Sequence, residues 1–185
     1  YAVRIRHGVV WMCLDPEPIG ELPEWSAFDA ATNARFQLGP HAWQVQASRI
    51  TENFNDLAHF ATVHAATFGD AGNAVAPTVD LQVDGDRIVH GVRMHQLDRV
   101  TLDGPEVSAE VSYRYTHVMP FASELVIVYA PDRIEWIQVA FTPSTSLDSD
   151  APETIVFQQN ARNFDVDGDI DAWSDFQAEV NEEDR

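Results

Sequence analysis

The chain has 185 residues, of which 45% are hydrophobic, enough to build one well-buried globular domain. Its 30 acidic and 11 basic residues give a formal net charge of -19, a surface that repels phosphate backbones, so we do not expect nucleic acid as a partner. No run of eighteen apolar residues is present, which argues against a membrane span. A single cysteine, Cys13, cannot form an internal disulfide and is typical of a reducing compartment, so we predict a cytoplasmic protein.

The first part of the chain predicts a small β-structure followed by a boundary. Two β-rich runs flank a His-Gly pair and predict a hairpin over residues 2–14. The Pro-rich residues 15–23 are the clearest connector in the chain. Residues 24–38 are irregular with some helical character, whereas apolar and polar residues alternate over residues 43–48 and predict a strand. We expect a fragment of a longer protein, since the first residues already resemble a strand and the last stop within a helical pattern.

A segment with the sequence ENFNDLAHFATVH carries the densest chemistry in the chain, with Asn53, Asp56, His59 and His64 within twelve positions. Two neutral imidazoles and one carboxylate form the facial triad that binds Fe(II) and leaves positions open for dioxygen. We predict a helix over residues 50–61. Histidines five apart are about 140° apart on an ideal helix, so both can bind one metal only if the helix loosens or ends between them. From the spacing alone, two unrelated histidines remain the alternative.

Asp56 and His59 are spaced i, i+3 and would be neighbours on one helix face. A carboxylate in that position can accept the other N–H of a metal-bound imidazole or of an incoming partner. We therefore expect Asp56 to lie beside the metal site and not in it.

The rest of the chain predicts a loop over residues 66–77 followed by an antiparallel sheet. The predicted strands are residues 79–83, 87–97, 106–119, 124–130, 133–143 and 153–161. Turn residues at 84–86 and 130–133 predict two hairpins. Consecutive antiparallel strands with helices before and after them indicate an α+β domain, in which a long curved sheet wrapped on a helix could leave a cavity.

Four other histidines give no indication of a metal site. His90 and His95 are five apart on one predicted strand, so they point to opposite faces and cannot jointly chelate an ion. His41 and His117 belong to no pattern. We assign none of the four to a metal.

The acidic residues near the C-terminus have two interpretations. Residues 163–171 match the first half of an EF-hand loop, but position 12 is Ser174 and a strand precedes the loop. A calcium site is therefore the weaker alternative to an acidic loop leading into a helix N-terminus, where carboxylates favour the dipole. Apolar residues at three- and four-residue steps, Trp173, Phe176 and Val180, predict a helix over residues 172–185.

The pattern Asn-x-x-Asp-x-x-His-x-x-x-x-His, continued by Thr-Phe-Gly-Asp at 67–70, resembles the iron-binding segment of Rieske non-haem iron oxygenases. This family comprises the alpha subunits of aromatic-ring-hydroxylating oxygenases and the oxidative demethylases. The resemblance implies a helix-grip (START-like) catalytic domain with a curved antiparallel sheet over residues 16–185. It also implies that residues 1–15 are the last hairpin of a Rieske ferredoxin domain. Because this chain lacks the Cys and His motifs that hold the family's 2Fe-2S cluster, we expect that cluster upstream.

The same resemblance implies the metal ligands. His59 and His64 match the two histidines of the family, and residues 179–185 resemble its acidic helix, where the third ligand is an Asp before a basic residue. That position is Asp184, with Asp175 and Glu183 as alternatives if the alignment of the helix differs. These three ligands would hold Fe(II).

As the resemblance implies, Asp56 would bridge electrons from the cluster of a neighbouring subunit in a homotrimer, with Asn53 near the iron. Electrons would come from NAD(P)H through a reductase, with or without a ferredoxin. The short interval between His64 and Asp184 is more similar to monooxygenases and demethylases than to dihydroxylating dioxygenases.

The predicted function is therefore activation of O2 for hydroxylation or oxidative demethylation of an aromatic or other apolar small molecule. Two alternatives remain. One is a non-enzymatic helix-grip domain that binds an apolar ligand without metal. The other is a zinc hydrolase with the same triad, since imidazole and carboxylate also suit zinc.

Overall fold

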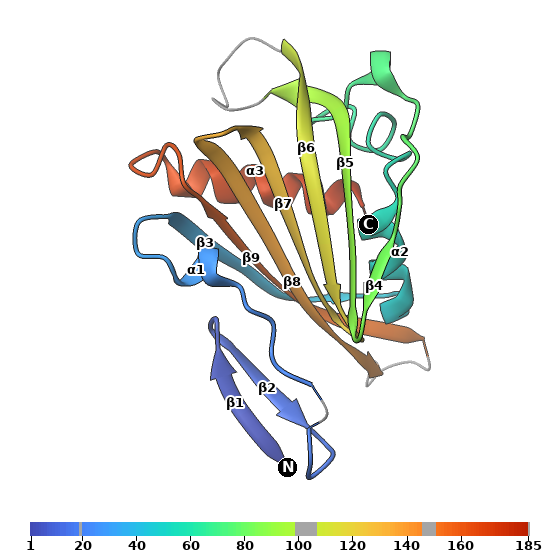
Figure 1. Cartoon of the computed structure of the whole chain (residues 1–185), viewed down its shortest axis with the longest axis vertical. Helices are drawn as coiled ribbons and strands as arrows, with labels where there is room; N and C mark the ends of the chain where they lie inside the picture. The colour runs from blue at the N-terminus through green and yellow to red at the C-terminus, as the bar shows by residue number, and fades with distance from the viewer. Residues whose placement is uncertain (19, 99–106, 146–150, 185) are drawn as a thin grey trace.

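The computed structural model describes residues 1–18, 20–98, 107–145 and 151–184. Its main element is a seven-stranded antiparallel sheet in the order β3–β9–β8–β7–β6–β5–β4 (Figure 1). The strands are β3 (Ala34–Trp43), β4 (Gln82–Asp84), β5 (Arg87–Asp98), β6 (Val107–Val118), β7 (Ala122–Ala130), β8 (Arg133–Thr145) and β9 (Pro152–Arg162). The helices are α1 (Ser26–Asp29), α2 (Ala47–Asn55), the 3-10 turn η1 (Ala71–Asn73) and α3 (Ile170–Glu183). The predicted α+β class with a curved antiparallel sheet is confirmed.

The predicted strands from residue 87 onward are confirmed, with ends that differ by a few residues. The turns at 84–86 and 130–133 connect antiparallel neighbours, β4 with β5 and β7 with β8, as predicted. Two predicted ends, residues 106 and 185, lie outside the described residues. Within the described part of the chain, no helix is long and apolar enough to cross a membrane.

The prediction of a strand over residues 43–48 is wrong. The strand β3 ends at Trp43, and Ala47 already begins α2. Gly39 and Pro40 interrupt the alternation of apolar and polar residues along β3, so the sequence did not indicate this strand. They lie at a shift in the pairing of β3 with β9, between Leu38 and His41. Such a bulge and a proline without an N–H are tolerated because β3 is an edge strand of the sheet.

The prediction that a helix covers residues 50–61 is also wrong at its C-terminal end. The helix α2 ends at Asn55, and Asp56 has extended backbone angles (φ -79°, ψ 99°). Its Oδ1 accepts the backbone N–H of Ala58 at 2.9 Å, a local bond that competes with helical hydrogen bonding. The second half of the motif therefore runs in consecutive turns, which free His59 and His64 from the helical spacing that would have kept them apart.

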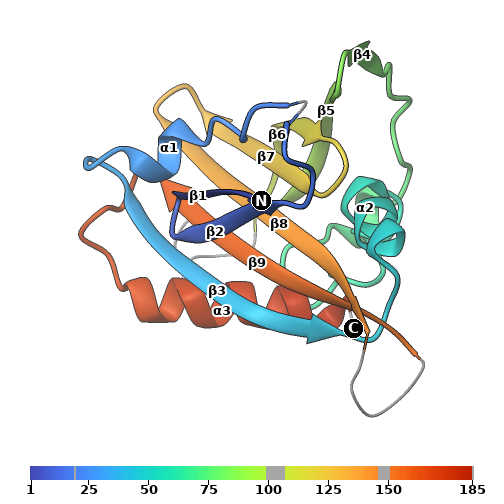
Figure 2. The same ribbon diagram turned by 90° about the horizontal axis from the view of Figure 1, so that it is seen from below.

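One face of the sheet is covered by helices and turns. In Figure 1 α3 passes behind the strands, and Figure 2 shows it lying along the sheet. Side chains after α2 enter the core, where Leu57 and Phe60 pack against Tyr113, Tyr115 and other residues of β5, β6 and β7. Burying a side chain of this size contributes about 1.5–3 kcal/mol. A cavity of about 600 Å³ remains between the sheet, α3 and the motif segment.

The predicted N-terminal hairpin is confirmed as a separate two-stranded sheet of β1 (Ala2–Arg6) and β2 (Val9–Cys13). His7 at its turn is buried, with Nδ1 3.1 Å from Asp29 Oδ1 and Nε2 3.2 Å from the carbonyl oxygen of Pro23. Gln37 of β3 donates to the carbonyl oxygen of His7 at 3.1 Å. The sequence placed His7 only at the turn of a hairpin, whereas these contacts attach the hairpin to the larger domain.

Candidate metal centre

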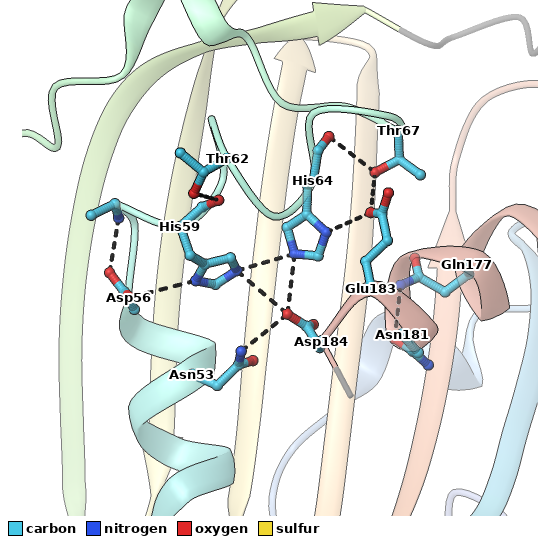
Figure 3. Close-up of polar contacts among 11 residues, drawn as sticks. Asn53, Asp56, His59, Thr62, His64, Thr67, Gln177, Asn181, Glu183 and Asp184 are labelled. Atoms are coloured by element: carbon cyan, nitrogen blue, oxygen red, sulfur yellow. Dashed lines mark hydrogen bonds and ion pairs between the residues drawn. The ribbon is translucent and has the colours of Figure 1, made fainter.

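Three potential metal ligands converge at the end of the cavity near the C-terminus of α3 (Figure 3). His59 and His64 come from the turns after α2, and Asp184 is the C-cap residue of α3. The Nε2 atoms of the two histidines are 3.1 Å apart, and Asp184 Oδ1 lies 3.6 Å from His59 Nε2 and 3.4 Å from His64 Nε2. Ligand atoms about 2.1 Å from one ion and at right angles to each other lie about 3.0 Å apart. The spacing therefore fits three ligands on one face of a single metal ion.

The imidazole of His64 is held from behind by a carboxylate. Its Nδ1 donates to Glu183 Oε2 at 2.8 Å, and Thr67 Oγ1 donates to the same oxygen at 2.7 Å. With the proton on Nδ1, the Nε2 lone pair points to the other two ligands. Glu183, the alternative ligand, thus contacts the far nitrogen of His64, and Asp175, the other alternative, is exposed on α3.

Asn53 orients the carboxylate of Asp184. Its Nδ2 donates to Asp184 Oδ1 at 3.0 Å, across 131 residues of sequence. This bond ties the last turns of α2 to the end of α3. Figure 3 shows the amide of Asn53 directed at Asp184, beside the two histidines.

Asp56 lies beside His59 and reaches the surface. Its Oδ2 is 3.7 Å from His59 Nδ1, longer than a hydrogen bond, and its side chain is 54% exposed. The Nδ1 of His59 is buried and has no hydrogen-bond partner. A small movement of Asp56 would supply that partner, while its other side remains open to solvent.

Burial and neighbouring charges act in opposite directions on the pKa values of the three candidate ligands. Burial lowers the pKa of His59, which keeps its ring neutral. Burial also acts to lower the pKa of His64, but hydrogen bonds and charges from Asp184 and Glu183 outweigh it and raise that pKa. Burial acts to raise the pKa of Asp184, yet hydrogen bonds from His64 and Asn53 hold it below its ordinary value. A divalent cation would replace the proton that His64 attracts.

A glycine that the sequence did not single out as functional fixes the turns. The backbone N–H of Gly69 donates to the carbonyl oxygen of His64 at 2.7 Å. A Cβ at this position would lie 2.0 Å from the carbonyl oxygen of Phe60 and 2.8 Å from that of His64. The only signal in the sequence was the turn-rich Phe-Gly-Asp that follows the motif.

The remaining candidates lie elsewhere. His90 and His117 direct their Nε2 atoms at Asn55 Oδ1, at 2.7 and 2.8 Å, and form a buried cluster of their own. In the acidic loop, Asp169 accepts the N–H of Ala172 at 3.0 Å and caps α3. Among the residues that the structure describes, no second group of three His, Cys, Asp or Glu side chains comes together as this one does.

Comparison with known proteins agrees with the fold and with the motif. The family model of the vanillate O-demethylase oxygenase C-terminal domain matches residues 43–184. Methylxanthine N1-demethylase NdmA of Pseudomonas putida is 30% identical over 172 residues, which are 88% of this chain and 45% of that protein. Methylxanthine N3-demethylase NdmB of the same organism is 30% identical over 125 residues, 66% of this chain and 34% of that one.

Solved structures show the same fold. The structure of NdmA from Pseudomonas putida CBB5 with caffeine superposes with a TM-score of 0.81 and 26% identity, covering 100% of this chain and 51% of that one. Dicamba monooxygenase bound to dicamba has a TM-score of 0.70 at 17% identity, over 90% of this chain and 51% of that one, and shows the fold alone. The chain spans about half the length of these relatives.

Proposed function

This chain belongs to the vanillate O-demethylase oxygenase C-terminal domain family, within the Rieske-type oxygenases, and on that premise we propose that it binds mononuclear Fe(II) through His59, His64 and Asp184. The reaction we propose is hydroxylation or oxidative demethylation of a small molecule bound in the adjoining cavity. The observation that carries the proposal is the separation of 3.1–3.6 Å among three ligand atoms in the wall of that cavity. When bound, the iron would supply dioxygen activation.

The chain's own residues would position the metal and shield it from water. Glu183 would hold the ring of His64, and Asn53 would hold Asp184, so both ligands keep their orientation without the metal. Aromatic side chains around the ligands support the shielding role: His64 stacks on Phe68, and Phe60 lies edge-on to His59. The protein's share of such chemistry is orientation, ligand field and exclusion of water.

We also propose that Asp56 is the electron bridge to a neighbouring subunit. Two observations support this role. Its carboxylate is 3.7 Å from an unpartnered nitrogen of His59, and it is exposed enough to meet another chain. The partner we propose is a second copy in a homotrimer that presents a 2Fe-2S cluster, with electrons from NAD(P)H through a reductase.

We propose in addition that residues 1–15 are the last hairpin of a Rieske ferredoxin domain and that residues 16–185 belong to the catalytic domain. The hairpin forms its own sheet and is joined to the rest by residues 15–23. Ile5, Val10 and Met12 expose 78%, 65% and 61% of their surface, which is typical of apolar side chains that pack against further structure.

Metal content tests the proposed function. The parent chain, His59→Ala and the exposed-histidine control His95→Ala would be purified without oxygen and loaded with Fe(II). We expect one iron per chain in the parent and in the control, and none in His59→Ala. Loss of iron in both variants, or iron retained in His59→Ala, would contradict the ligand assignment. A site that excludes iron and takes only zinc would favour the hydrolase alternative.

A further inference from the structure

A closed ring of four amide side chains lies between β9 and α3. Gln158 donates to Asn160 at 2.9 Å, Asn160 to Gln177 at 3.3 Å, Gln177 to Asn181 at 3.4 Å, and Asn181 back to Gln158 at 2.9 Å. Each amide donates one N–H and accepts one hydrogen bond within the ring. Gln158 and Asn160 are two residues apart on a strand, so their side chains lie on the same face of the sheet. Gln177 and Asn181 are four residues apart on a helix, so their side chains lie on the same face of the helix.

The ring forms part of the cavity wall. Gln158, Gln177 and Asn181 line the cavity, whereas Asn160 is fully buried behind them. A carboxamide has two N–H donors and an oxygen with two lone pairs, so each ring member keeps one donor and one lone pair beyond its ring bonds. The wall therefore offers both donors and acceptors without carrying a charge.

The ring also lies at a suitable distance from the metal ligands. Asn181 and Gln177 precede Asp184 by three and seven residues, which corresponds to about 4.5 and 10 Å along the helix axis. Figure 3 shows both amides on α3 beside the turn that carries Asp184. We consider a substrate with one aromatic ring whose reacting carbon lies at the metal. A polar group on the opposite side of that aromatic ring would then lie against these amides.

The charges of the cavity act against an anionic substrate. Its lining includes four carboxylates, Glu135, Asp165, Asp169 and Asp184, and one guanidinium, Arg162. That guanidinium donates from Nη2 to the carboxylate of Asp165 at 2.7 Å and lies 4.2 Å above the ring of Trp173, while its buried Nε has no hydrogen-bond partner. With a divalent metal ion bound, the ionisable groups of the lining would still carry one formal negative charge in excess, so the cavity as a whole does not attract an anion.

We propose that Gln158, Gln177 and Asn181, held in place by Asn160, are the subsite for an uncharged carbonyl or carboxamide group of the substrate, and that the cavity discriminates against carboxylates. The inference rests on the proposed function, because it treats the cavity beside the metal ligands as the substrate site. Asn160 is a positioning residue, since it meets the cavity only through its neighbours.

A matched pair of probes tests the subsite. 3-Methoxybenzamide and 3-methoxybenzoate have nearly the same shape, and only the second is charged at pH 7. Calorimetric titration would compare their binding to the parent, to Gln177→Leu and Gln177→Lys, and to the exposed control Gln82→Leu. Iron content would be measured on the same preparations, so that failure of the metal centre and failure of the subsite are separated.

We expect the parent and the control to bind the amide about tenfold more tightly than the carboxylate. Gln177→Leu should lose about three- to tenfold in affinity for the amide with iron content unchanged, and Gln177→Lys should reverse the preference. Equal binding of the two probes, or no binding of either by an iron-loaded parent, would overturn the subsite and leave the oxygenase proposal standing. Discrimination that persists in a parent without iron would support the subsite while contradicting the metal centre.

Discussion

The contact between Glu183 and His64 provides the sharpest test of how this site is built. Glu183 does not approach the metal position, yet its Oε2 accepts from His64 Nδ1 at 2.8 Å and from Thr67 at 2.7 Å. Without the Glu183 carboxylate, the buried imidazole of His64 could rotate, and its proton would no longer be held on Nδ1. Changes of this kind behind a metal-binding histidine cost about 10–100-fold in metal affinity. We therefore expect Glu183→Ala to weaken Fe(II) binding by about 1.4–2.7 kcal/mol.

The assay is an anaerobic titration with Fe(II), repeated with Co(II) as a spectroscopic probe of the same ligands. Glu183→Gln keeps an acceptor oxygen but loses the charge, so its affinity should lie between those of the parent and Glu183→Ala. Glu179→Ala, on the exposed face of the same helix, controls for a lost carboxylate in an acidic protein. If Glu183→Ala and Glu179→Ala bind metal equally well, the orienting role of Glu183 is refuted.

Three further predictions concern neighbouring residues. In the full-length protein Asp56→Asn should retain iron but slow its reduction, and turnover at the parent rate would exclude the bridge. Gly69→Ala should destabilise the fold and lose metal, because its Cβ would lie 2.0 Å from the carbonyl oxygen of Phe60, whereas Gly91→Ala, with its nearest contact at 3.6 Å, should fold and bind metal normally. Burial lowers the pKa of His117 from 6.5 to about 4, so its contribution to stability is present above pH 6.5 and is lost as the pH falls toward 4. Urea unfolding at pH 7 and pH 4.5 should show that loss, about 1–3 kcal/mol, in the parent and not in His117→Gln; equal losses would contradict the assignment.

The sequence predicted the sheet well because its strands are long and mostly consecutive. The turn residues at 84–86 and 130–133 marked the hairpins. Apolar and polar residues alternate along β6 to β9, and this alternation gives the sheet one buried face. It failed at β3, where Gly39-Pro40 interrupts the alternation and only pairing with β9 keeps the strand extended. Local patterns could not show that pairing, since its two partners are far apart in the chain.

The three candidate ligands, Asn53 and Asp56 were predicted from the motif and the resemblance, whereas the other residues that support the site were not. Each of His59, His64 and Asp184 had a signal of its own or a family resemblance, and the structure brings their ligand atoms within 4.8 Å of one another. Thr67 appeared only as part of the Thr-Phe-Gly-Asp that follows the motif, and the ring amides carried no signal, because a hydroxyl or an amide acquires a role only from its tertiary partner. The helix boundary at Asn55 was missed for a similar reason, since Asp56 can either continue a helix or end it by bonding to Ala58.

The assembly of the centre follows from the order of elements around the sheet. The edge strand β3 leads into α2, and its partner β9 leads into α3, so the pairing of β3 with β9 fixes where both helices start. Because α3 begins beyond the end of β9 at Arg162 and runs back along the sheet, its C-terminal end reaches the level of α2 (Figure 2). There Asn53 of α2 donates to the C-cap residue Asp184. The proposed metal site would therefore be sensitive to the β3–β9 register as well as to its own ligands. A shift of two residues in that register would move one helix by about 7 Å relative to the other, about twice the spacing of 3.1–3.6 Å between the ligand atoms.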